Sequence, residues 1–222
     1  MTRVLHRRVA PRRQARRATA WWAKAWVRAV EEAAYAEADL RRARTLARSG
    51  RIGRITVDDG HLFAAVVDGD DVWTVTAAVP VLDGTATDAL VETVAAEAGR
   101  VAALLGGDLP FSLVEHAEEA GVELLPYGGE LETGCSCVSW ADPCVHALAV
   151  LYQVAWLLDD DPFVLLQLRG LDRDQLLARL HARAPAPAAT DDDLDEGLDA
   201  AFRAARVLEL LEEPDRPVDH LF

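Results

Sequence analysis

Apolar residues recur at helical spacing near the start of the chain. Trp22, Trp26 and Val30 follow one another at four-residue intervals, so they form a single stripe on a helix. Gly50 favours the end of a helix at this point. The pattern therefore predicts one long amphipathic helix over residues 21–48.

The pattern then changes to the alternation that is typical of strands. Residues 52–57, 62–67 and 72–79 are rich in β-branched side chains and are separated by Asp/Gly turns, and Pro80 ends the last of them. A three-stranded meander cannot bury a face alone, so we expect the Trp-rich helix to pack on it. Residues 21–82 should thus form one helix-plus-sheet unit.

Helical spacing returns further along the chain. Residues 83–121 should form a helical connector, with Asp108 and Pro110 opening its last helix. A short hairpin is expected next, with strands at 122–125 and 131–137. The remaining predicted helices cover 144–158, 161–170 and 172–182. The predicted class is α+β: an N-terminal helix with a small antiparallel meander, a helical segment, and a ββα zinc finger with further helices over 122–183.

The two ends of the chain differ from the middle. Residues 1–20 are rich in arginine and lack acidic side chains, which predicts a flexible basic tail and superficially resembles a transit peptide. Residues 184–190 alternate Pro and Ala as linkers do. The acidic segment that follows, to residue 222, fits either a short docking helix or a solvated tail.

Charge divides the chain sharply. The net charge of −14 conceals +11 over residues 1–54 and −25 over the rest, and no Lys or Arg lies between Arg100 and Arg169. With 51% hydrophobic residues, wholesale disorder is excluded, and no apolar run is long enough to span a bilayer. A single Lys beside 22 Arg is typical of a GC-rich bacterial genome.

All three cysteines fall within ten residues, in the array Cys135-x-Cys137-x6-Cys144-x-His146. Residues i and i+2 of a strand face the same side, so the first two thiols can reach one ion. The other two ligands arrive at a helix start, where the helix dipole favours thiolates. The array predicts one structural Zn²⁺ held in a reducing, cytoplasmic compartment. A redox Cys-x-Cys pair is the alternative, but it leaves Cys144 and His146 without a role.

The array resembles the SWIM zinc finger, whose pattern is Cys-x-Cys, a variable gap, and Cys-x-His leading into an apolar helix. The segments Trp21-Trp22-Ala-Lys-Ala-Trp26 and 161–170 are similar to parts of bacterial SWIM-finger proteins found alongside Swi/Snf-type helicase-like ATPases. The resemblance implies that the four Cys and His residues are the ligands and that the protein binds DNA or proteins. Val145 departs from the pattern, because relatives commonly carry a basic residue there.

A binding role is expected rather than an enzymatic one. Four protein ligands close the zinc coordination sphere, and no P-loop lysine or nucleophile motif is present. The first hypothesis is a protein-interaction module, an accessory subunit of a helicase-like ATPase. The second is nucleic-acid binding; since residues 101–168 carry eleven acidic and no basic side chains, the phosphates would have to be contacted elsewhere. The candidate contacts are Arg7, Arg8, Arg12, Arg13, Arg16, Arg17, Lys24 and Arg28.

Overall fold

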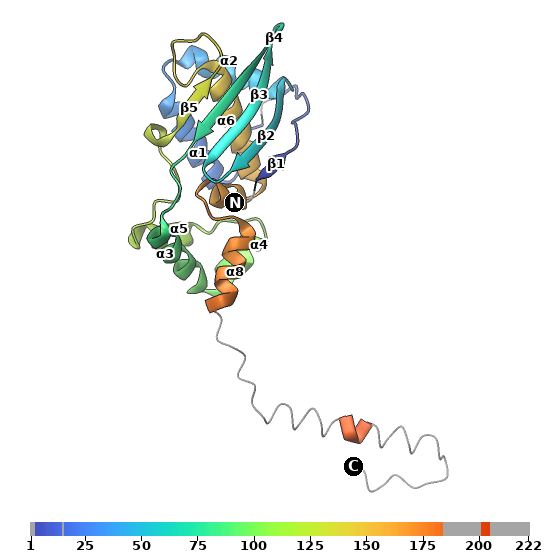
Figure 1. The fold of residues 1–222 in the computed structure, drawn as a ribbon, viewed down its shortest axis with the longest axis vertical. Coiled ribbons are helices and arrows are strands. Elements are labelled where there is room, and N and C mark those ends of the chain that lie inside the picture. The colour runs from blue at the N-terminus through green and yellow to red at the C-terminus, as the bar shows by residue number, and fades with distance from the viewer. Residues whose placement is uncertain (1–2, 15, 184–200, 205–222) are drawn as a thin grey trace, which may run out of the picture. The chain divides into compact units, whose positions relative to one another are not determined.

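The computed structural model describes residues 3–14, 16–183 and 201–204 (Figure 1). The chain divides into two compact units, residues 1–182 and 183–222. Residues 201–204, which lie in the acidic C-terminal segment, are helical. The rest of the predicted linker and C-terminal segment lies outside the described residues.

An antiparallel sheet organises the first unit. Its strands are β1 (Val4–His6), β2 (Ile52–Asp58), β3 (His61–Asp68), β4 (Asp71–Ala78) and β5 (Glu132–Cys135). They lie side by side in the order β1-β2-β3-β4-β5, and every neighbouring pair is antiparallel. The meander therefore forms the middle of a wider sheet, with a strand from elsewhere in the chain added at each edge.

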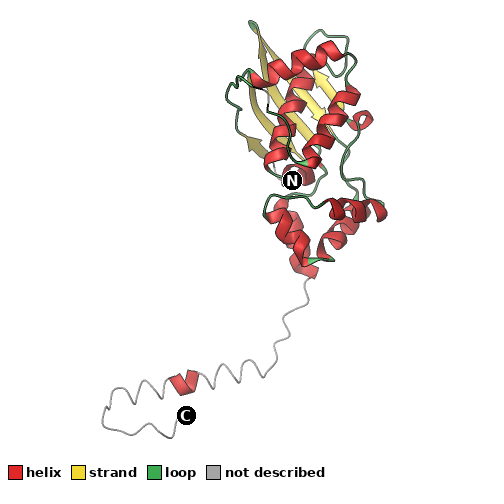
Figure 2. Cartoon of the chain, turned by 180° about the vertical axis from the view of Figure 1, so that it is seen from behind, coloured by secondary structure: helices red, strands yellow, loops and turns green. Residues whose placement is uncertain are grey.

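Three helices cover one face of this sheet: α1 (Trp21–Ala33), α2 (Glu37–Arg48) and α6 (Val145–Asp160). The view from behind in Figure 2 shows them lying across the strands. α6 is the central element, and residues 147–156 in it are all buried. The fold is thus α+β, as predicted, with one helix-covered sheet face.

Buried polar side chains fasten these helices together. The indole N–H of Trp22 donates to the Leu158 carbonyl oxygen at 2.7 Å, and that of Trp26 donates to Leu151 at 3.0 Å. Gln153 of α6 donates to the Ala47 carbonyl oxygen of α2 at 2.7 Å. Each bond satisfies a buried donor, so the tryptophans serve the core and fix how α1 crosses α6.

The remaining helices are α3 (Gly84–Ala95), α4 (Ala98–Leu105), α5 (Phe111–Glu119), α7 (Phe163–Leu168) and α8 (Arg173–Arg183). The first three occupy the segment for which the sequence predicts helices. The buried Arg100 of α4 joins them, donating to the Thr93 carbonyl oxygen at 2.6 Å and contacting Glu97 and His116. Among the described residues, no helix is both long and apolar enough to cross a bilayer.

The single helix predicted over 21–48 is wrong. The chain leaves the helical conformation at Ala34, with ψ 137°, and α2 begins only after Ala36. A straight helix of 28 residues would extend about 42 Å. The break at Tyr35 lets two shorter helices both pack against α6.

The expectation of a flexible N-terminal tail is also wrong for the described residues. Val4–His6 pairs with β2, so it completes one edge of the sheet. Further along, the backbone N–H of Arg12 donates to the Arg48 carbonyl oxygen at 2.9 Å, and the Trp156 indole donates to the Arg16 carbonyl oxygen at 3.0 Å. Main-chain hydrogen bonds to the body therefore hold this basic arm in place.

The predicted finger hairpin is replaced by a different pairing. Residues 122–125 form no strand, and β5 pairs with β4 instead, with Cys135 opposite Val75. The turn at Gly128 packs on α1 so closely that a Cβ there would lie 2.9 Å from the Ala29 carbonyl oxygen. This close contact draws the turn away from a local hairpin and toward the helix.

Candidate metal centre

The four predicted ligands converge where β5 meets the start of α6. Cys135 ends β5, Cys137 follows two residues later, Cys144 caps α6, and His146 lies in its first turn. Their ligand atoms all lie within 4.8 Å of one another. The Nδ1 atom of His146 is 3.8 Å from the Cys135 Sγ and 4.0 Å from the Cys144 Sγ.

These separations fit one tetrahedral ion. With metal–sulfur bonds of about 2.3 Å and metal–nitrogen bonds of about 2.0 Å, a tetrahedron places its sulfur and nitrogen ligands roughly 3.5 Å apart. The two sulfur–nitrogen separations, 3.8 and 4.0 Å, exceed that by up to about half an ångström. Three thiols and one imidazole therefore form a donor set that can bind one metal ion with little rearrangement.

Strand pairing fixes the first two ligands. Ser136 lies between them and exchanges two hydrogen bonds with Thr74 of β4: its N–H donates to the Thr74 carbonyl oxygen and its hydroxyl accepts from the Thr74 N–H, both at 2.9 Å. These two bonds extend the contact with β4 by one residue beyond the end of β5, and they hold the chain in place between the two cysteines. Thr133 also donates to Asp142, which joins the two ends of the loop.

Asp68 and Trp73 contact the imidazole of His146. The Oδ2 atom of Asp68 lies 3.3 Å from its Nε2, on the side of the ring away from the thiols. The Trp73 ring stacks on the imidazole at a centroid distance of 5.9 Å. A carboxylate behind a ligating histidine fixes its tautomer and orientation. Sequence reasoning missed both residues, because Asp68 has the pattern of a turn and Trp73 that of a strand.

The three thiols differ in acidity. Burial raises the pKa of Cys135 to about 12 and also raises that of Cys144. Burial opposes ionisation of Cys137 too, but hydrogen bonds from the Ser139 N–H and from His146 outweigh it and lower its pKa to about 7. A cation bound here would displace protons from the other two thiols, so metal binding should weaken as the pH falls.

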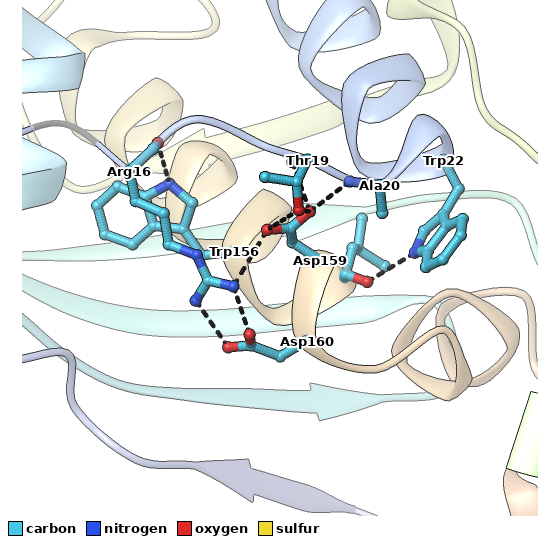
Figure 3. Close-up of polar contacts among 8 residues, drawn as sticks. Arg16, Thr19, Ala20, Trp22, Trp156, Asp159 and Asp160 are labelled. Carbon is cyan, nitrogen blue, oxygen red and sulfur yellow. Dashed lines mark hydrogen bonds and ion pairs between the residues drawn. The ribbon is translucent and has the colours of Figure 1, made fainter. Parts of the chain in front are cut away.

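The eight basic residues proposed as nucleic-acid contacts do not share one role. The Arg8 side chain donates to the Gly50 carbonyl oxygen at 2.8 Å, and Arg12 lies 5.6 Å above the Trp156 ring. Arg16 forms ion pairs with Asp159 and Asp160, as Figure 3 shows. The other five are exposed and form no ion pair with any described residue; they are Arg7, Arg13, Arg17, Lys24 and Arg28.

Comparison with known proteins gives one informative likeness. The chain is 33% identical over 178 residues to the uncharacterized protein Rv2102 of Mycobacterium tuberculosis. The match covers 78% of this chain and 64% of that protein, so the chain spans less than two thirds of the relative's length. No family model and no solved structure matches the chain. The relative's name assigns no activity.

Proposed function

We propose that this protein is a SWIM-type, zinc-stabilised interaction module without enzymatic activity. The observation that carries the proposal is the convergence of Cys135, Cys137, Cys144 and His146 within 4.8 Å. Thiolate and imidazole ligands in a set of four are typical of structural Zn²⁺. A full set of protein ligands leaves no open position for an activated water, which favours a structural role over catalysis.

The zinc would join the end of β5 to the start of α6. Two ligands belong to the end of β5, and two to the start of α6. Bound together, they would fix the eight residues between Cys135 and Cys144, whose central part is exposed and has no regular structure. The metal thereby stabilises a surface loop on an otherwise well-packed body.

The loop displays apolar side chains suited to a protein partner. Val138 is 98% exposed and Trp140 is 78% exposed, and Tyr35, at the break between α1 and α2, is 72% exposed. The Tyr35 and Trp140 rings meet edge to face at 4.8 Å. Exposed Trp and Tyr side chains are favoured anchors of protein interfaces. The proposed partner is a helicase-like ATPase of the Swi/Snf type, to which this chain would be an accessory subunit.

Metal removal tests the structural part of the proposal. A strong chelator should lower the thermal midpoint of the native protein, and Cys137→Ser should lower it without chelator. Val138→Ser is the matched control, because it changes a fully exposed side chain in the same loop. If neither the chelator nor Cys137→Ser changed the thermal midpoint, the protein would have no structural metal. A reversible Cys135–Cys137 disulfide in metal-free protein would instead favour the redox alternative.

Co-purification from the native host tests the partner. The wild-type chain should recover a helicase-like ATPase, and Trp140→Ala should lose it while keeping the wild-type metal content and melting behaviour. Recovery of the wild-type chain alone under gentle conditions would count against the accessory-subunit role. Equal recovery with Trp140→Ala would place the interface elsewhere.

A further inference from the structure

Two basic clefts flank α2. The first has a volume of about 450 Å³, and its lining includes Arg16, Arg17, Lys24, Arg44 and Trp156. The second has a volume of about 630 Å³, and it is lined by Arg41, Arg42, Thr45, Leu46, Ser49 and Arg51 together with the acidic Asp68 and the apolar Val145. Because α2 contributes residues to both, the clefts lie on two sides of the same helix. We call the basic residues of the two clefts the α2 basic surface.

The folded arm is what completes this surface. Its backbone joins the end of α2 through the bond from Arg12 to Arg48, and Arg8 donates to Gly50 just beyond the helix. The arm then continues into the first cleft, to which it contributes Arg16 and Arg17. Cations that lie about 30 positions apart in the sequence are thereby gathered around α2.

Some of these cations build the walls and others remain free. Arg44 donates to Glu31 at 2.6 Å, Arg16 is held by Asp159 and Asp160, and Arg51 lies 3.5 Å from Asp68. Arg17, Lys24 and Arg42 are exposed and form no ion pair with any residue that the structure describes. The paired arginines are held in place by these acids, and the unpaired side chains are available to contact an anion.

We propose that the α2 basic surface binds the phosphate backbone of nucleic acid. A helix of 12 residues is about 18 Å long. At about 3.4 Å per base pair along the B-form helix axis, that length corresponds to roughly five base pairs, so the spread of cations suits a polymer better than a single small anion. Arginine forks also favour phosphate geometrically.

The unpaired cations of this surface differ in chemistry from the metal ligands, although the second cleft is also lined by Val145 and Asp68, which lie beside those ligands. The segment from residue 101 to 168, which holds all four ligands, contributes acidic but no Lys or Arg side chains. The three unpaired cations belong instead to the arm, α1 and α2. Nucleic-acid binding at the α2 basic surface is therefore independent of the proposed ATPase partner, and either proposal can fail alone.

Fluorescence anisotropy tests the site with the full-length, metal-replete protein. Labelled 20-nucleotide single strands and duplexes are titrated at two salt concentrations. The triple variant Arg17→Ala, Lys24→Ala, Arg42→Ala should bind both probes more weakly, with a loss of affinity of at least about 10-fold at low salt. Its plot of log affinity against log salt concentration should have a slope shallower by about two to three units. The two probes identify which form of nucleic acid is preferred.

A charge-matched control separates the site from bulk charge. The triple variant Arg54→Ala, Arg173→Ala, Arg179→Ala removes the same charge from residues that line neither cleft. It should retain wild-type affinity. Three results would overturn the proposal: no binding of either probe by the wild type, an equal loss in both triple variants, or displacement by polyglutamate as readily as by unlabelled DNA. The last would point to an acidic protein instead.

Discussion

At the scale of single residues, Asp159 binds the two residues that directly precede α1. Its carboxylate accepts from the N–H groups of Thr19 and Ala20, both at 2.7 Å, and lies 3.1 Å from the Arg16 guanidinium (Figure 3). The side chain is only 3% exposed. Burial alone would raise the pKa of Asp159, but these hydrogen bonds outweigh it and lower the pKa below its usual value.

Replacing Asp159 should therefore destabilise the fold. Asp159→Ala leaves two N–H groups without their acceptor and removes one of the two carboxylates that pair with Arg16, at a cost of about 3 kcal/mol in the free energy of unfolding. Asp160→Ala is the control, since that side chain is 62% exposed and should cost less than about 1 kcal/mol. Denaturant titration at pH 7 measures both, and equal effects would contradict the account.

The same carboxylate predicts a pH dependence. Its pKa is lowered in the folded state, so its stabilisation is fully present above the unfolded value of about 3.9 and is lost as the pH falls through the folded value. The difference in unfolding free energy between wild type and Asp159→Asn should thus shrink below about pH 4. If this difference in unfolding free energy grew as the pH fell, the pKa of Asp159 would not be lowered in the folded state.

The contact between Asp68 and His146 supports another prediction at the scale of residues. Asp68→Ala removes the carboxylate beside the His146 Nε2, so metal affinity should fall about 10- to 100-fold. Asp71→Ala is the control because it removes an exposed acid from the same β-turn. Competition with a chromogenic chelator measures the affinity, and equal affinity in both variants would exclude a role for Asp68.

The ligands were predictable from the sequence and their supporting residues were not. The four ligands lie within twelve positions, so their spacing alone indicates a common target. Asp68 and Trp73 lie more than 70 positions before His146, and they reach it only because β4 pairs with β5. That pairing depends on tertiary packing, which no local pattern encodes.

At the scale of elements, β1 is a strand that the sequence pattern did not predict. It has three residues, too few to display alternation, and it lies in an arginine-rich segment with the composition of a tail. The break at Tyr35 was concealed too, because Ala-rich sequence on both sides favours helix and no Gly or Pro interrupts it. Packing of α1 and α2 against α6 overrides that local preference.

Deleting residues 1–10 tests the structural role of β1. The edge of β2 would lose the pairing from Val4↔Val57 to His6↔Ile55, at a cost of about 2 to 4 kcal/mol for the lost bonds and packing. An uncovered strand edge also favours association between chains. Thermal unfolding with light scattering measures both effects. If the truncated protein kept the wild-type thermal midpoint and stayed monomeric, residues 1–10 would be a tail without a structural role.

At the scale of the whole molecule, the charge asymmetry has a structural consequence. The basic N-terminal portion folds back onto the body, where Arg16 meets Asp159 and Asp160, and Arg3 meets Asp58. Other cations of this portion line the two clefts beside α2, namely Arg17, Lys24, Arg41, Arg42, Arg44 and Arg51, whereas residues 135–146 contain no Lys or Arg. The two proposed binding roles therefore belong to surfaces of different charge, one cationic and one apolar within an acid-rich segment.

The central claim is that one zinc ion joins β5 to α6. Elemental analysis of protein purified in its native state, without added metal or chelator, tests it most directly. We expect one zinc per chain in the wild type and in Val138→Ser, and a loss of most of it in Cys137→Ser and His146→Ala. A fully folded wild-type protein with less than about one tenth of an equivalent of any transition metal would contradict the claim.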